Sequence, residues 1–176
     1  MSAFLSWRRG LHSANAFARR RPVLVSAVVT CVKAWAADLM IQKLVEKREA
    51  VDVRRSALFA SFGLCYQGFF QYWMYNILYE RVLFPGRGVR NTVAKIAATN
   101  IISDPVFFFP CFYSMREVLV TGASAEVAVP AGLHKYAENY WQDWLSSWAI
   151  WVPTHCVTYT VVPPHLRMPW IAAVSF

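Results

Sequence analysis

The sequence predicts an all-α protein: a polytopic transmembrane helical bundle of about four spanning helices, with an N-terminal interfacial helix and a short C-terminal half-helix. Hydrophobic residues make up 57% of the chain and charged residues 16%, whereas soluble domains carry about 25% charge. Two stretches, 56–79 and 144–166, contain no charged residue over 24 and 23 positions, and about 20 apolar residues cross a bilayer as a helix. Few segments alternate in polarity, which favours helices over a membrane barrel.

Residues 1–21 form a basic amphipathic segment that we expect to lie at the membrane surface. No acidic residue precedes Asp38, and the stretch before it is rich in arginine. On a helical wheel Phe4, Trp7 and Leu11 share one face, which is the pattern of an interfacial helix. The same composition is typical of a mitochondrial transit segment, so a retained surface helix and a cleaved leader both fit the sequence.

The first two predicted spans, residues 22–45 and 56–84, are separated by a hydrophilic turn and followed by the basic turn PGRGVR at 85–90. Each span has one face on which small and polar residues recur at helical spacing. Because small residues let helix backbones approach closely, we predict that these two faces form the seam of the bundle. The faces carry Ala34, Asp38 and Gln42 in the first span, and Ala60, Gly63 and Gln67 in the second.

The third predicted span, residues 91–121, contains the motif DPVFFFP, with Asp104, Pro105 and Pro110. Asp is a preferred N-cap and Pro is preferred in the first helical turn. We therefore predict a helix break here, with a new half-helix starting at Pro105, while a simple proline kink is the alternative. The fourth span begins near residue 130, becomes apolar at Trp144 and is predicted to be interrupted at Pro153.

Half of the eight tryptophans lie in the fourth span, at positions three, four and three apart. On a helix this spacing places Trp141, Trp144, Trp148 and Trp151 in one stripe. Trp141 and Trp144 neighbour polar residues, so we expect them in the headgroup belt, where amphipathic rings are favoured. The other two lie in the apolar part, and we expect them to pack against another helix.

The stretch 168–176 is a short apolar segment after two prolines. Its nine residues would give a helix of about 13 Å, which is too short to span a bilayer. A helix ending there would leave carbonyl groups unpaired at membrane depth. We therefore expect a half-helix, and we expect the natural polypeptide to continue beyond Phe176.

Polar residues inside the spans are the candidate functional residues. An ionisable side chain at mid-membrane costs about 2.5–3.5 kcal/mol, so such groups should face water or the bundle interior. They could line a solute path, or they could hydrogen-bond between helices as structural contacts. The candidates are Lys33, Asp38, Gln42, Gln67, Gln71, Asp104, His155 and Thr158.

Several function classes have no support in the sequence. The four histidines are scattered, and no CxxC pair, nucleophile motif or phosphate loop occurs. We therefore expect no enzymatic activity, no metal and no cofactor. The net charge of +8 comes from basic residues that flank apolar spans, which predicts contact with anionic lipids rather than nucleic acid.

The fourth span ends in WAIWVPTHCVTYTVVPPHLR, which resembles the C-terminal signature of the Mpv-seventeen and peroxisomal-membrane-protein-twenty-two family. The matching residues are Trp148, Trp151, Pro153, Val162, Pro163 and Arg167. His155 and Thr158 replace a Gln and an Asn of that signature. Further similarities are Asp38 with Gln42, an Asp-x-x-Arg turn at 52–55, and Asp104 with Pro110. The resemblance covers residues 22–176, which we expect to form one transmembrane helical domain.

The resemblance implies a multi-pass protein of the mitochondrial inner membrane or, alternatively, of the peroxisomal membrane. Members of the family are thought to form small-solute pores or to maintain membrane homeostasis. The alternative interpretation is a non-catalytic accessory subunit of a larger mitochondrial membrane complex. Either a homo-oligomer or such a complex would then be the partner, besides the lipid bilayer.

Overall fold

A computed structural model describes residues 2–86 and 88–176, except for the side chains of residues 2–9 and 11. Every regular element in these residues is a helix, which confirms the all-α prediction. The chain packs as two compact units, Met1–Ile77 with Val162–Phe176, and Leu78–Val161. Within these described residues, two helices are long and apolar enough to cross a membrane, Pro22–Val45 and Val89–Thr121.

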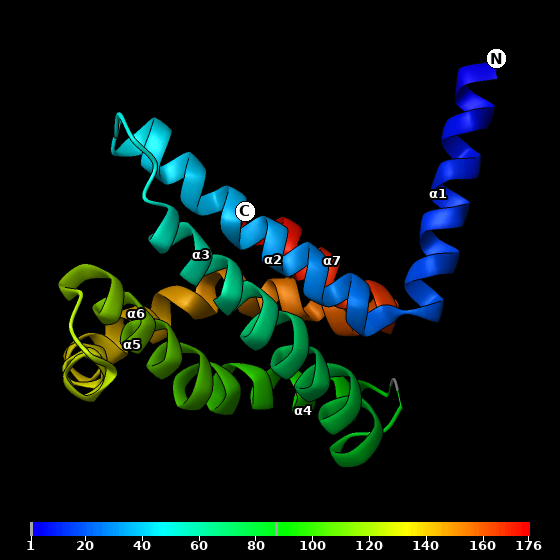
Figure 1. Ribbon diagram of the computed structural model, residues 1–176. Coiled ribbons are helices and arrows are strands. Elements are labelled where there is room, and N and C mark those ends of the chain that lie inside the picture. Colours follow the sequence, from blue (N-terminus) through cyan, green and yellow to red (C-terminus); the bar gives the residue numbers. More distant parts are fainter. Residues whose placement is uncertain (1, 87) are drawn as a thin grey trace. The chain divides into compact units, whose positions relative to one another are not determined.

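The first unit is built around two long helices that lie side by side (Figure 1). After α1 (Ser2–Arg20), Pro22 occupies the first turn of α2 (Pro22–Met40), where its missing N–H costs nothing. The helix continues as the π-helical stretch η1 (Ile41–Val45). Three elements then follow each other as one helical run: α3 (Val53–Phe62), η2 (Gly63–Gln71) and η3 (Met74–Leu83).

The same unit also contains the C-terminal part of the chain. A 3-10 turn, η5 (Pro164–Leu166), leads into the short helix α7 (Arg167–Val174), which packs against α2 (Figure 1). The helix α7 corresponds to the predicted C-terminal half-helix. The predicted interfacial face of α1 includes Phe4, Trp7 and Leu11, whose side chains lie outside the described residues.

Backbones touch where α2 meets η2. The Thr30 hydroxyl donates to the Gly63 carbonyl at 2.7 Å. A Cβ added at Gly63 would lie 2.4 Å from the Thr30 carbonyl oxygen, and one added at Gly68 would lie 2.5 Å from the Ala27 Cα. Ala34 is buried and Ala60 is half-buried. Glycine is needed at both close positions because no other residue leaves room for the facing backbone.

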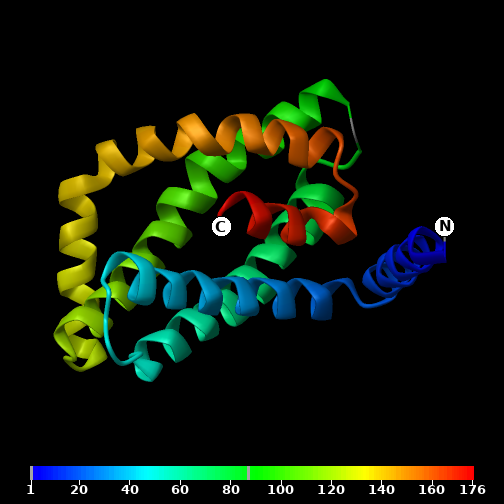
Figure 2. The same ribbon diagram turned by 90° about the horizontal axis from the view of Figure 1, so that it is seen from above.

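The second unit consists of the end of η3 and two long helical runs. The first run comprises α4 (Val89–Ala98), η4 (Thr99–Phe108) and α5 (Phe109–Thr121). Gly122, in the left-handed conformation with φ of 66°, ends α5 and turns the chain into α6 (Ala125–Thr160). The helices α5 and α6 pack closely, because a Cβ on Gly132 would lie 2.8 Å from the Ser114 Cα. Figure 2 shows that α6 bends along its length.

The predicted helix breaks at Pro105, Pro110 and Pro153 are wrong. Residues 89–121 form one uninterrupted helical run, and α6 continues through Pro153. Around Pro105 the run consists of π-type turns. The carbonyl groups that lose a backbone donor at Pro105 and Pro110 accept hydrogen bonds from side chains of α6. Pro153 removes one hydrogen bond from a helix of 36 residues, and the bonds on both sides keep the helix intact.

We predict that Gly63→Ala destabilises the protein, because the new methyl group would overlap the Thr30 carbonyl. Overpacking of this kind costs about 1–3 kcal/mol. Gly10→Ala is the matched control, since nothing lies within 4 Å of its Cβ position. Thermal unfolding in detergent measures both, and equal melting temperatures for the two variants would contradict the close α2–η2 contact.

Candidate functional site

A stripe of buried polar residues follows the helical run 89–121. Four of these residues recur at steps of three and four, and the other two each follow one of these four directly in the sequence, so all six share one side of the run. Each is at most 7% exposed. The polar stripe, as we call it, consists of Thr92, Lys95, Thr99, Asn100, Ser103 and Asp104.

Three members of the polar stripe bond to other helices of the same unit. The Lys95 ammonium forms an ion pair with Glu80 at 2.8 Å and donates to the Gly86 carbonyl at 2.7 Å. The Thr99 hydroxyl lies 3.0 Å from the Tyr159 hydroxyl, and the Ser103 hydroxyl lies 2.5 Å from that of Tyr79. These bonds compensate for the burial of polar groups, which is costly when they are unpaired.

Two neighbouring members keep free acceptor groups. The Asn100 side-chain oxygen is buried without a hydrogen-bond partner among the described residues. The Asp104 side chain is 7% exposed, and no described residue donates a hydrogen bond to its carboxylate or pairs with it. Because these residues are four apart, their side chains lie one helical turn from each other. Together they form a pair of buried oxygen ligands that could accept from water or contact a cation.

The two prolines of DPVFFFP explain how this helix meets α6. In a π-type turn the N–H of residue i bonds the carbonyl of residue i−5, and the Phe109 N–H does bond the Asp104 carbonyl. Pro105 and Pro110 have no N–H. In this register the carbonyls that lose their donors are those of Asn100 and Pro105.

Side chains from α6 donate to both of these carbonyls. The indole nitrogens of Trp144 and Trp148 lie 2.7 and 3.2 Å from the Asn100 carbonyl oxygen. The Tyr136 hydroxyl donates to the Pro105 carbonyl at 2.9 Å. The aromatic donors of α6 are therefore spaced so that they replace the two backbone hydrogen bonds that the prolines remove. Trp141 is 67% exposed and makes no such bond among the described residues.

The C-terminal half of α6 carries the remaining polar candidates of this unit. Trp151 stacks on His155, with ring centroids 5.5 Å apart, and His155 contacts Tyr159 at 5.9 Å. Thr158 is fully buried and its hydroxyl donates to the Thr154 carbonyl at 2.8 Å. These residues place a second set of polar groups beside the bond between Tyr159 and Thr99.

The first unit contains a separate polar network where α2 and α3 meet the turn between them. Asp38, whose side chain is 0% exposed, pairs with Arg55 at 2.7 Å and accepts from Gln42 and Ser56, both at 2.7 Å. Arg55 also pairs with Glu46 at 2.7 Å. The hydrogen bond from Arg55 is the main reason that the Glu46 pKa is lowered. The pairing of Glu46 with Arg55 therefore stabilises the folded protein at pH values above the ordinary Glu pKa. This stabilisation is lost as the pH falls through the lowered pKa of Glu46.

The other candidates of this unit lie elsewhere. Gln67 is half-buried in η2, and Gln71 donates to the Tyr75 hydroxyl at 2.9 Å. Arg167, from the C-terminal signature, is fully buried, and its guanidinium donates to the Tyr75 carbonyl at 3.5 Å and to Asn76 at 3.4 Å. Lys33 lies in an apolar groove that is described below. The candidates thus fall into distinct groups, and no cluster of metal-ligating side chains occurs in the described part of the chain.

Comparison with known proteins supports the resemblance seen in the sequence. Residues 128–176 match the Mpv17 / PMP22 family. The chain is 26% identical to Protein sym-1 of Neurospora crassa, over 97% of this chain and 92% of the relative. It is 24% identical to the Mpv17-like protein of Xenopus laevis (91% and 74%), and 26% identical to Protein SYM1 of Saccharomyces cerevisiae (94% and 84%). No solved structure matches the chain significantly.

We predict that Tyr136→Phe destabilises the protein, because it leaves the Pro105 carbonyl without a donor. An unsatisfied buried polar group costs about 1–3 kcal/mol. Tyr140→Phe is the matched control, since the Tyr140 ring lies 5.6 Å from that of Tyr136 and its hydroxyl bonds to no described residue. The free energy of unfolding in denaturant measures each variant.

A second substitution tests the cause. Pro110→Ala would supply the missing N–H, so Tyr136→Phe should cost less in that background than in the parent. An equal cost in both backgrounds would contradict the assignment of the freed carbonyl.

We further predict that Arg55→Gln destabilises the protein by up to about 3 kcal/mol, because it leaves the buried Asp38 carboxylate without its cation. Arg54→Gln removes the same charge from the neighbouring, exposed position and should change stability by less than about 0.5 kcal/mol. Thermal unfolding at neutral pH compares the two. Similar losses for both variants would show that net charge, rather than the network, is responsible.

Proposed function

We propose that this chain, a relative of the Mpv17 / PMP22 family and an Mpv17-like protein of an organelle membrane, provides a passage for small hydrophilic solutes. The observation that carries this proposal is the polar stripe, which runs along a helix long enough to cross a bilayer. We place the protein in the mitochondrial inner membrane, with the peroxisomal membrane as the alternative.

The proposed protein crosses the membrane four times. The helical run 53–83 and the 36-residue α6 would be the second and fourth spans. At 1.5 Å per residue α6 measures about 54 Å, which exceeds the roughly 30 Å of a hydrocarbon core. The length of α6 is consistent with its polar first turns lying in water and Trp141 and Trp144 lying near the interface.

A passage explains the free acceptors of the polar stripe better than packing alone. Polar groups that serve only to hold helices together are expected to be paired with each other. Lys95, Thr99 and Ser103 follow that rule, but the Asn100 oxygen and the Asp104 carboxylate keep free acceptor groups among the described residues. An anionic group in a water-filled path attracts cations. We therefore propose that Asp104 lines the passage and favours cations there.

The alternative function is that of an accessory subunit in a larger membrane complex. The paired members of the polar stripe favour it, because they suit a tightly packed helix. The two functions differ in what purifies with the protein. Stoichiometric co-purification of other membrane proteins from native membranes supports the subunit, whereas a free homo-oligomer supports the passage.

We predict that Asp104→Asn lowers the cation selectivity of the reconstituted protein, because it removes the negative charge but keeps the size of the side chain. The reversal potential in a planar bilayer under a salt gradient measures this selectivity. Glu126→Gln, which removes a charge from an exposed position in the first turn of α6, should leave it unchanged. A parent protein without conductance would contradict the passage, and unchanged selectivity in Asp104→Asn would contradict the role of Asp104.

A further inference from the structure

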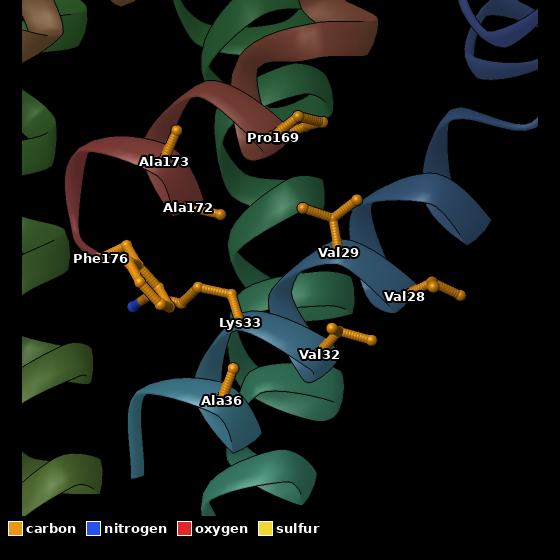
Figure 3. Close-up of a pocket in the computed structure, with 9 residues that line it drawn as sticks. All are labelled: Val28, Val29, Val32, Lys33, Ala36, Pro169, Ala172, Ala173 and Phe176. Carbon is orange, nitrogen blue, oxygen red and sulfur yellow. The ribbon is translucent and has the colours of Figure 1, made fainter. Parts of the chain in front are cut away.

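The first unit contains an apolar groove between α2 and α7 (Figure 3). Its volume is about 480 Å³, which lies within the range of about 300–1,000 Å³ that is usual for sites binding one small molecule. The groove is open along one side. It is lined by Val28, Val29, Val32, Lys33, Ala36, Pro169, Ala172, Ala173 and Phe176.

Lys33 is the one polar side chain among the lining residues. It lies near the middle of the candidate span Pro22–Val45, and its side chain extends along the groove toward Phe176 (Figure 3). No described residue forms an ion pair with the Lys33 ammonium or accepts a hydrogen bond from it. Asp38, the buried charge of the same helix, is paired with Arg55, whereas the half-buried Lys33 has no such partner among the described residues.

A single ammonium group in apolar surroundings is stabilised by an anion that brings its own apolar part. A carboxylate would form a charge-assisted hydrogen bond with the amine, and a hydrocarbon chain would cover the apolar lining. We propose that the groove binds one long-chain fatty acid anion, with its carboxylate at Lys33 and its acyl chain between α2 and α7.

Other classes of ligand fit the groove less well. A nucleotide or a polar metabolite would bury several polar groups against a lining that offers one donor, and unpaired buried polar groups are costly. A small inorganic anion would pair with Lys33 but leave the apolar hollow unfilled. A two-chain phospholipid has a second acyl chain for which the single groove provides no place. The proposal does not depend on the solute passage, because all lining residues belong to the first unit.

The test uses the whole protein in nanodiscs of a zwitterionic lipid, with displacement of a fluorescent fatty acid by palmitate as the measurement. Lys33→Gln should weaken palmitate binding about tenfold or more, since it removes a charge-assisted contact, and Lys33→Arg should retain binding. Lys43→Gln is the matched control, because it removes the same charge from an exposed position outside the groove. Ala173→Phe, at an exposed position of the lining, should block the groove while Lys33 remains.

Two uncharged or larger competitors complete the test. Methyl palmitate lacks the carboxylate anion. Its affinity for the parent protein should not exceed the affinity of palmitate for the Lys33→Gln variant. Phosphatidylglycerol should displace the probe poorly. Equal palmitate affinity in the parent and Lys33→Gln would overturn the proposal, as would unchanged binding in Ala173→Phe or displacement by phosphatidylglycerol as effective as that by palmitate.

Discussion

The structure of the second unit depends on how two carbonyl groups are satisfied. Pro105 and Pro110 remove two donors from the helix that carries the polar stripe, and in an apolar environment each unpaired carbonyl would be costly. Trp144, Trp148 and Tyr136 supply the missing donors from α6. The prolines therefore act as attachment points between two helices rather than as ends of helices. The same contacts hold the polar stripe against α6.

In the first unit, two helices are held together by close backbone contact and by a buried polar network. Gly63 and Gly68 bring the backbones of η2 and α2 into contact. At the end of this contact the buried Asp38 is surrounded by donors from both helices. Small residues in the middle and a charged network at the end thus fix the same pair of helices. Lys33 lies on another side of α2, in the groove toward α7, and belongs to neither contact.

Polar residues inside the spans consequently have different roles that their chemistry alone does not reveal. Asp38 and Asp104 are both aspartates in apolar helices. The Asp38 carboxylate has three side-chain partners, whereas the Asp104 carboxylate has none among the described residues. That difference is the reason for proposing a structural role for Asp38 and a place in the proposed passage for Asp104. In a membrane protein a buried charge without a protein partner points to a ligand, an ion or water.

The sequence by itself determined the helical class, the approximate ends of the helices and the close approach at Gly63, because the length and periodicity of apolar residues are local properties. It did not determine the role of Pro105, since the carbonyl that a proline frees depends on whether the turn is α-type or π-type. It also did not place Lys33 beside α7 or Trp144 beside Asn100. Those pairs are separated by many residues, and only tertiary packing decides which side chains meet.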